Sequence, residues 1–369
     1  MGARQIASVI HSMARLLSPN DEREGLLETM QRRATVTAGE FEPQGISMLL
    51  WALATMRERA DRELLEAMQT RAMTTAGEFG PQAVANLLWA LATMGEKADR
   101  KLLETMQSRA TATAGEFKPQ EVSNMLWALA TMGERADRKL LNAMQRQATA
   151  TAGEFDPQNV ANVLWSLAVM DNIFNKDLTV LVDHLAARIL VLRDQFSEAE
   201  KSQLHQWILA CELGLASGAS LPEGVALVKQ TIGVDCLEAF SGQATHESQL
   251  QREVAAAVRS TGLKVEIEEE YRDARSGYSI DILVRRRSAA GGTGRAKSEE
   301  EPFAEWAVEV DGPSHFLGGS RTPSGNTLLK RRQLEQLGYT VVPVPFWEWD
   351  ALRGVEAKRR CLVDKLGAC

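Results

Sequence analysis

The sequence predicts an α-solenoid of 38-residue helical-hairpin repeats, followed by a small α/β domain. Two observations indicate this fold class. Four nearly identical segments recur at one fixed spacing before residue 178, and alternating apolar and polar segments of strand length appear only after residue 244. The 369 residues are enough for a helical array and one further domain.

Composition narrows the classes of protein. The hydrophobic content of 44% and the charged content of 25% are ordinary for a globular protein. No run of 18 or more apolar residues occurs, so we expect no membrane-spanning segment. The net charge of −7 argues against a broad, non-specific nucleic-acid binder. The cysteines form no C-x-x-C pair, which indicates incidental thiols rather than a zinc or disulfide framework: Cys211, Cys236, Cys361 and Cys369.

The four repeats begin at Leu26, Leu64, Leu102 and Leu140, 38 residues apart. The aromatic residues of each copy keep the same spacing: Phe41, Phe79, Phe117 and Phe155, and Trp51, Trp89, Trp127 and Trp165. A decayed copy is expected from Phe196 to Leu213. The N-terminal segment ARQIASVIHSMARLL aligns with the repeat helices, so we interpret it as a damaged first repeat. A weak organelle transit signal is the alternative, because the segment is rich in arginine and serine.

Each repeat is predicted to form two helices. The first begins at the proline of F-x-P-Q, because the missing N–H of proline costs nothing at the first helical position. In the second copy, apolar residues at i, i+3, i+4 and i+7 give this helix one buried face: Val84, Leu87, Leu88 and Leu91. Asp99 is placed to cap the second helix, which is expected to end near Gly115. One hairpin cannot bury its own apolar face, so the hairpins must stack around a long concave surface.

The tryptophan and two variable positions of each repeat are the candidates for ligand contacts. We interpret the tryptophan as core, because its neighbours Leu88 and Leu91 are apolar; a platform for stacking bases is the alternative. The variable positions hold Gly45, Ala83, Glu121 and Asn159, and then Met48, Asn86, Asn124 and Asn162. Polar residues that differ between repeats suit a reader of one base per repeat, since amides pair with base edges. Neutral drift on a solvated surface would explain the variation equally well.

The 38-residue period, the F-x-P-Q start and the LLWALATMG core resemble the octotricopeptide repeat of algal and related organelle RNA-binding proteins. The resemblance covers residues 3–213 and is strongest from Leu26 to Asp177. It implies a superhelix that binds single-stranded RNA in a mitochondrion or plastid. The spacing by itself would also allow a helical scaffold whose groove binds a peptide.

The sequence pattern changes after Leu213. The glycine-rich stretch 214–224 is predicted as a linker, and VALVKQTIGVDCLEAF as a connecting helix. From residue 245 the predicted order is helix, three strands, helix, strand and helix. The strands are KVEIEEEY and YSIDILVR, which form a hairpin, then FAEWAVEVDG and YTVVPVPFWEW. The charged segment Arg285–Glu301 is predicted as a mobile loop.

Residues Ala307–Leu366 resemble the RAP domain of RNA-binding proteins. The segments VEVDGPSHF, LLKRRQLEQLGYTVVPVPFWEW and KRRCLVDKL carry this resemblance, which implies a restriction-endonuclease-like fold. Arg331 and Arg332 are candidate RNA contacts. We therefore divide the chain into a repeat solenoid at 1–213, a linker with a connecting helix at 214–244, and a RAP domain at 245–369.

Under this resemblance the predicted strands carry a candidate metal site. Asp281 matches the first acid of such nucleases, and Glu309 and Asp311 share one face of the next strand, since residues i and i+2 point to the same side. The helix acid Glu253 could supply a further ligand. The set implies Mg²⁺ or Mn²⁺ and an endoribonuclease, in which His315 stands where the very-short-patch-repair branch has histidine.

One position departs from the nuclease motif. Asp311 stands where the pattern E-x-K places lysine, and Lys330 on the following helix is the candidate to replace it. The alternative is that the acids cap loops and pair with Arg331 and Arg332, since Asp311-Gly312-Pro313 is also favourable turn chemistry. We expect sequence-selective binding of single-stranded organelle RNA, in RNA processing, stability or translation, with protein partners from an RNA-processing complex. Metal-dependent RNA cleavage through Asp281, Glu309, Asp311, His315 and Lys330 and peptide binding are the alternatives.

Overall fold

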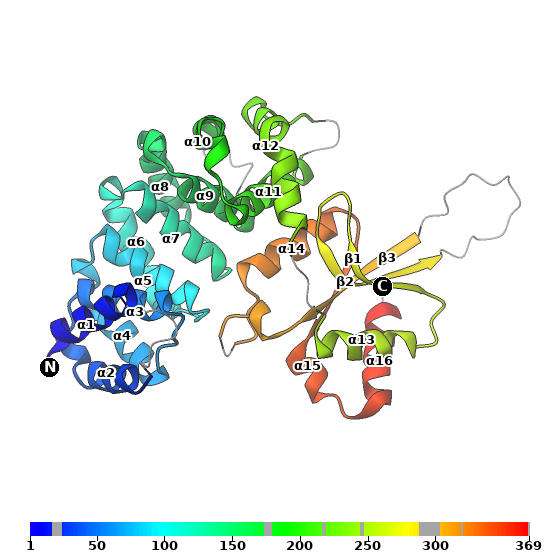
Figure 1. Ribbon diagram of the computed structural model, residues 1–369, viewed down its shortest axis with the longest axis horizontal. Helices are drawn as coiled ribbons and strands as arrows, with labels where there is room; N and C mark the ends of the chain where they lie inside the picture. Colours follow the sequence, from blue (N-terminus) through cyan, green and yellow to red (C-terminus); the bar gives the residue numbers. More distant parts are fainter. Residues whose placement is uncertain are drawn as a thin grey trace, which may run out of the picture.

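The repeats form a curved, two-layer helical array in the computed structural model, which describes residues 1–16, 24–172, 179–215, 219–243, 247–287, 303–318 and 320–367 (Figure 1). The inner layer holds the first helix of each hairpin, the A helices: α1 (Ala3–Leu16), α3 (Pro43–Thr55), α5 (Pro81–Thr93), α7 (Pro119–Thr131), α9 (Pro157–Val169) and α11 (Glu198–Leu213). The outer layer holds the B helices: α2 (Glu24–Val36), α4 (Arg62–Thr74), α6 (Arg100–Ala112), α8 (Arg138–Ala150), α10 (Thr179–Leu192) and α12 (Glu223–Ser241). Successive A helices pack side by side, which confirms the predicted solenoid.

A 3-10 turn joins each B helix to the next A helix. The turns are Ala38–Glu40 (η1), Ala76–Glu78 (η2), Ala114–Glu116 (η3), Ala152–Glu154 (η4) and Arg193–Gln195 (η6). In the four clear repeats a proline then occupies the first helical position, as predicted. The phenylalanine before it is buried, and its carbonyl oxygen accepts a hydrogen bond from the B helix of the same hairpin, as from Arg71 Nε to Phe41 (2.8 Å). The motif therefore fixes the angle between the two helices.

Side-chain caps and apolar faces also follow the predicted pattern. Asp99 Oδ1 accepts hydrogen bonds from the backbone N–H groups of Lys101 and Leu102, at 2.8 and 3.1 Å. The helix that it caps, α6, ends at Ala112, just before the turn that contains Gly115. The predicted apolar face of α5 is fully buried: Val84, Leu87, Leu88 and Leu91. Gln69 Oε1 of α4 accepts a hydrogen bond from the backbone N–H of Asp99 (2.9 Å). The B helix of one repeat is therefore bonded to the residue that caps the next B helix.

The C-terminal domain is a four-stranded sheet between helices. Its strands are β1 (Glu266–Arg272), β2 (Ser279–Arg287), β3 (Phe303–Asp311) and β4 (Thr340–Pro345), in that order across the sheet. The pairs β1–β2 and β2–β3 are antiparallel, and β4 runs parallel to β3 after the crossover helix α14 (Gly325–Gln336). One face packs against α13 (Gln249–Arg259) and α16 (Gly354–Gly367), and the other against α14 and the end of α11.

The predicted end of the last strand was wrong. The segment FWEW, predicted as the end of the strand, instead begins the short helix α15 (Phe346–Ala351) directly after Pro345. Trp349 is 1% exposed, whereas Phe346, Trp347 and Glu348 are all half-buried. A strand would instead bury alternate residues. Of the predicted mobile loop, the first residues continue β2 to Arg287, and 288–302 lie outside the described residues.

Helix α12 connects the two parts of the chain. It packs on α10 and α11, while the ring of Phe240 near its end lies edge-on to Tyr278 of the C-terminal domain, with 4.9 Å between the ring centroids. The boundaries 1–213, 214–244 and 245–369 stay a prediction. Within the described part of the chain, no helix combines the length and apolar composition needed to cross a membrane.

Candidate functional site

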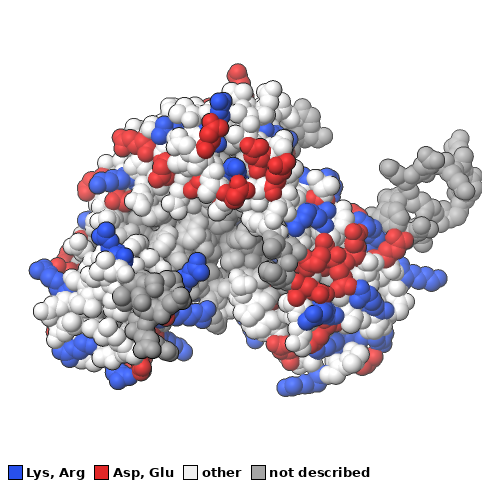
Figure 2. Space-filling model, in the orientation of Figure 1, with Lys and Arg blue, Asp and Glu red and all other residues white. Residues whose placement is uncertain are grey.

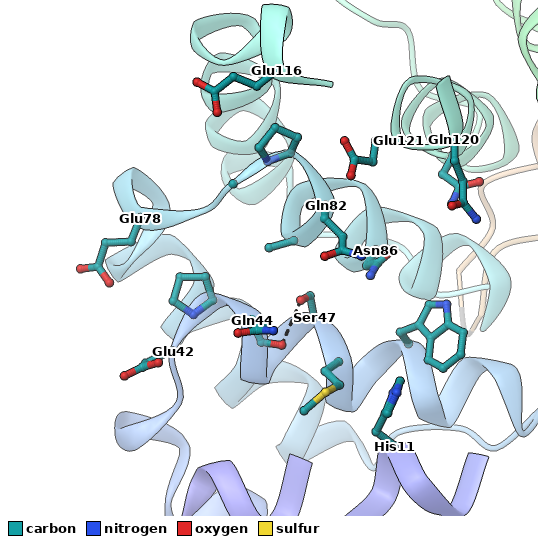
Figure 3. Close-up of a pocket in the computed structure, with 17 residues that line it drawn as sticks. His11, Glu42, Gln44, Ser47, Glu78, Gln82, Asn86, Glu116, Gln120 and Glu121 are labelled. Carbon is teal, nitrogen blue, oxygen red and sulfur yellow. Dashed lines mark hydrogen bonds between the residues drawn. The ribbon is translucent and has the colours of Figure 1, made fainter. Parts of the chain in front are cut away.

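A cavity of about 850 Å³ opens on the inner layer at the N-terminal end of the array (Figure 3). The first turns of α3, α5 and α7 line it, together with His11 of α1. Each of the three A helices contributes the same glutamine, Gln44, Gln82 or Gln120. Because the cavity crosses three successive repeats, an extended ligand can meet one equivalent set of side chains per repeat.

A row of aromatic rings runs along the same inner surface. His11 occupies in α1 the place that tryptophan occupies in the later A helices, and its ring lies 5.3 Å from that of Trp51. The next pair, Trp51 and Trp89, is 6.4 Å apart. Trp51, Trp89 and Trp127 pack on the core but stay partly exposed, and Trp51 lines the cavity. The prediction of a core role is therefore incomplete, since Trp51 also lines the cavity and the other two rings are partly exposed.

The predicted reader positions fall into two groups. Asn86, Asn124 and Glu121 line the cavity, and the two amides have no hydrogen-bond partner among the described residues. Glu121 Oε2 accepts from the backbone N–H of Lys118 (2.9 Å), which caps α7. The fourth repeat differs, because Asn159 and Asn162 are buried, at 5% and 6% exposure. The structure therefore brings three of the five predicted polar readers to the groove.

The buried amides have partners inside the protein. Asn159 Oδ1 accepts a hydrogen bond from Ser123 Oγ (2.7 Å), and Asn162 Oδ1 accepts one from Gln203 Nε2 (3.1 Å). Both bonds join α9 to a neighbouring A helix, so these side chains hold the inner layer together.

The edge of the cavity where the A helices begin is acidic. Glu42, Glu78 and Glu116 lie in a row at the edge where the A helices begin, while Gln82, Asn86 and Gln120 lie further in (Figure 3). Among the residues that the structure describes, no lysine or arginine lines the cavity. A phosphate group inside it would therefore meet carboxylates, which is unfavourable.

Exposed basic residues follow the other ends of the A helices. Arg59, Lys97 and Arg135 occupy equivalent positions after α3, α5 and α7, and a glutamate directly precedes each of them. Thirteen helical residues separate the two edges in each repeat, a length of about 20 Å. These cations were not predicted from the sequence, although a basic residue stands at one fixed position in three copies. Figure 2 shows acidic and basic side chains interspersed on the face in view, without a broad basic surface there.

The second candidate site lies in the C-terminal domain, where strand acids meet the helix α14. Lys330 Nζ donates to Glu309 Oε2 at 2.5 Å, and Arg331 donates to Asp311 Oδ2 at 2.5 Å. His315 Nδ1 lies 3.2 Å from Asp311 Oδ1. Asp281 Oδ2 accepts from the backbone N–H of Val310 (2.7 Å). The structure thus brings together the five residues predicted here, and Lys330 does reach the acids.

Two other predicted residues lie elsewhere. The carboxylate of Glu253 accepts hydrogen bonds from Lys358 Nζ (2.9 Å) and Trp349 Nε1 (3.3 Å). The guanidinium of Arg332 donates to the backbone carbonyls of Ala168 and Val169, the latter at 3.1 Å, at the end of α9. Arg332 therefore caps a solenoid helix, where a cation is favoured by the helix dipole.

Burial controls the protonation of the acidic cluster. Glu309 and Asp311 are 2% and 1% exposed. Burial and the neighbouring Asp281 raise the pKa of Glu309 to about 7, against the effect of Lys330. Burial also raises the pKa of Asp281, which Lys330 and the Val310 N–H oppose. For Lys330, burial lowers the pKa but Glu309, Asp281 and Asp311 raise it further, so the ammonium stays charged.

The pairing of the three acids limits the oxygens that they can offer to a divalent cation. Such a cation needs several free carboxylate oxygens around one point. Here Lys330 binds one oxygen of Glu309, Arg331 binds one of Asp311, and a backbone N–H binds one of Asp281. Glu309 Oε1 and Asp311 Oδ1 are buried and have no hydrogen-bond partner among the described residues. Among the described residues, no group of three or more metal-binding side chains is placed to hold a metal ion. The positive charge that these acids require is supplied by α14.

Comparison with known protein families identifies the family of this chain. The family model of the RNA-editing substrate-binding complex 6 protein matches residues 1–205, more than half of the 369 residues. The chain belongs to this family. In this member of the RNA-editing substrate-binding complex 6 family, the match runs from α1 into α11 and so includes the whole groove. The RAP domain model matches residues 308–365, from β3 into α16. The resemblance to an octotricopeptide-repeat protein with a C-terminal RAP domain is confirmed.

Two relatives share short segments with the chain. A "RAP domain-containing protein, chloroplastic" from Oryza sativa subsp. japonica is 33% identical over 107 residues, which are 29% of this chain and 13% of the relative. The "FAST kinase domain-containing protein 5, mitochondrial" from Mus musculus is 40% identical over 50 residues, 14% of this chain and 7% of the relative. The matched segments span only a small part of either relative.

Proposed function

We propose that the chain binds single-stranded RNA of a mitochondrion or plastid, with base selectivity, in RNA processing, stability or translation. The observation that carries the proposal is the groove across α3, α5 and α7, where each repeat presents an amide or other side chain at the same place. Such a surface suits a ligand whose chemical units repeat, and amides pair with base edges. The family name and the organelles in the relatives' names support RNA and an organelle, and protein partners in an RNA-binding complex.

The charges of the groove favour one orientation of the RNA. Its carboxylates would repel phosphates, so the bases face the cavity and the partly exposed tryptophans. The backbone then runs past the exposed Arg59 and Arg135 at the opposite ends of the A helices, since phosphate contacts supply most of the affinity. The aromatic rings contribute stacking that tolerates any base.

Salt dependence tests this orientation. Replacing Arg59 and Arg135 by alanine removes two phosphate contacts, so the slope of log affinity against log salt should fall by about 1.4. The matched control replaces Arg62 and Arg100, which pair with Glu66 and Glu104 on α4 and α6. The control removes the same charge and should leave the slope unchanged. Equal loss of slope in both variants would contradict a defined phosphate path.

The acidic cavity also favours a second candidate, a scaffold that binds a basic peptide. Its four carboxylates, Glu42, Glu78, Glu116 and Glu121, suit lysine or arginine side chains. In that case glutamine at these positions should weaken peptide binding, and the chain should not bind RNA above background in moderate salt. The RNA proposal predicts the reverse, namely that the same glutamines leave RNA affinity unchanged or raise it.

A third candidate is metal-dependent RNA cleavage. The contact of Lys330 with Glu309 favours it, because the strand pattern itself lacks this lysine. The pairing of all three acids argues against it. The test is incubation of RNA with Mg²⁺ or Mn²⁺, with Asp311→Ala as the comparison. Cleavage through this site would be shown by cutting of RNA that Asp311→Ala abolishes while the variant still binds RNA. We do not expect this result.

A further inference from the structure

The C-terminal domain covers the far end of the groove. Helix α14 lies against the inner layer at α7, α9 and α11 (Figure 1). Its residue Leu329 and the preceding Leu317 are buried in the same apolar core as the repeats. The backbone of Gly325 meets α7 so closely that an added Cβ would lie 1.8 Å from the carbonyl oxygen of Ala130. The contact is thus a packed interface.

A buried polar network fastens this interface at α11. Gln206 takes the position in α11 that Trp165 takes in α9, and its Oε1 accepts a hydrogen bond from Trp165 Nε1 (2.9 Å). Its Nε2 donates to the hydroxyl of Tyr278 (2.9 Å) and to Asn326 Oδ1 (3.2 Å). Gln333 of α14 closes the network, since its Nε2 donates to the backbone oxygen of Gln206 and its Oε1 accepts from Tyr278. Breaking such a network would leave several buried polar groups unpaired, which is costly.

The turns of earlier repeats hold the same domain. The N–H of Gly318 donates to the carbonyl of Gly95, and Lys97 Nζ donates to Thr322 Oγ1 (3.2 Å). Arg332 caps α9 through its last carbonyls. The domain therefore contacts the ends of α5, α7 and α9, and its position along the solenoid is fixed.

The inner layer changes character where this cover begins. On α5 and α7, Asn86, Asn124 and Trp127 are partly exposed. On α9 every residue from Asn159 to Val169 is buried, including the equivalent Asn162 and Trp165. The same sequence positions are thus open in three repeats and closed in the fourth.

We infer that the RAP domain is the end wall of the groove, so that α3, α5 and α7 contact bases and α9 and α11 do not. The inference rests on the proposed RNA binding and adds which helices of the groove contact the RNA. Asn159 and Asn162 then act as structural side chains, although they occupy reader positions in the sequence. The length of RNA read is limited by where α14 docks and not by the number of repeats.

Crosslinking of the unchanged, full-length chain tests the inference directly. The probe is a pool of short single-stranded RNAs that carry 4-thiouridine, and the crosslinked peptides are identified by mass spectrometry after ultraviolet irradiation. We expect crosslinks on α3, α5 and α7, and none on Asn159–Val169 or on α11. Crosslinks on α9 or α11 would overturn the inference while leaving RNA binding intact. Failure to bind any RNA would overturn the proposed function as well.

Matched substitutions give a second, independent test. Asn124→Ala should reduce the discrimination between the preferred base and the others about tenfold at one RNA position, equivalent to about 1.4 kcal/mol. Asn162→Ala should leave every base preference within twofold, even where it lowers the midpoint of thermal unfolding. A change of base preference in Asn162→Ala as large as that in Asn124→Ala would contradict the end wall.

Discussion

Lys330 places a positive charge beside the acidic cluster of the C-terminal domain. The structure brings the three acids and the histidine together, because Asp281 lies on β2 and Glu309 and Asp311 lie on the adjacent antiparallel strand β3. The sequence did not show which cation balances them. That depends on where α14 crosses the sheet, which fixes Lys330 beside Glu309 and Arg331 beside Asp311. Asp311 thus stands at the strand position where the nuclease pattern has lysine, and Lys330 of α14 places a cation beside Glu309.

The raised pKa of Glu309 predicts a specific dependence of stability on pH. Its pKa is about 7 in the folded protein against an ordinary value of 4.5, so the folded state binds this proton more tightly. The resulting stabilisation is complete below pH 4.5 and is lost as the pH rises to about 7, at most about 3 kcal/mol. Glu309→Gln cannot ionise. Between pH 5 and pH 8, urea unfolding should therefore show a larger loss of stability for the unchanged protein than for this variant.

The exposed Glu266 on β1 offers a matched control for this effect. Glu266→Gln should follow the unchanged protein at every pH, because that side chain is in water in both states. Identical pH profiles for Glu309→Gln and the unchanged protein would show that Glu309 ionises normally.

At the scale of elements, the helical hairpins were predictable and the end of the sheet was not. Proline at the first helical position, the aspartate cap and the i, i+3, i+4 pattern are local signals, so the helices begin and end close to where they were expected. The segment FWEWDA alternates like a strand, but only Trp349 is taken into the core, which a single helical turn achieves. Tertiary burial overrode the local pattern there.

The docking of α14 is predicted to be intolerant of a side chain at Gly325. In Gly325→Ala the new Cβ would lie 1.8 Å from Ala130 O and 2.9 Å from Val169 Cγ1, so α14 must move away from the solenoid. We expect a loss of about 2 kcal/mol in stability and faster proteolysis between the two parts. Gly312→Ala is the control, because nothing lies within 4 Å of its added Cβ. If both variants unfold like the unchanged protein, the docked arrangement is wrong.

At the scale of the whole molecule, the sequence predicted two parts but not how they combine. Four repeats of nearly one sequence suggested four equivalent readers, yet Asn162 is buried where Asn124 is open. Asn162 bonds to Gln203 of the neighbouring α11, and α14 packs on α9 and α11 through contacts between segments more than 100 residues apart, such as Gln206 with Gln333. No local pattern carries that information, because the residues of α9 are those of a normal repeat.

The most direct test of the account is selection of RNA by the full-length chain from a randomised single-stranded pool at moderate salt. We predict that a short sequence is enriched, and that the double substitution Asn86→Ala and Asn124→Ala abolishes the enrichment while leaving the salt-dependent affinity largely intact. The contradictory result would be binding without enrichment of any sequence, or an enriched sequence that the double substitution leaves unchanged.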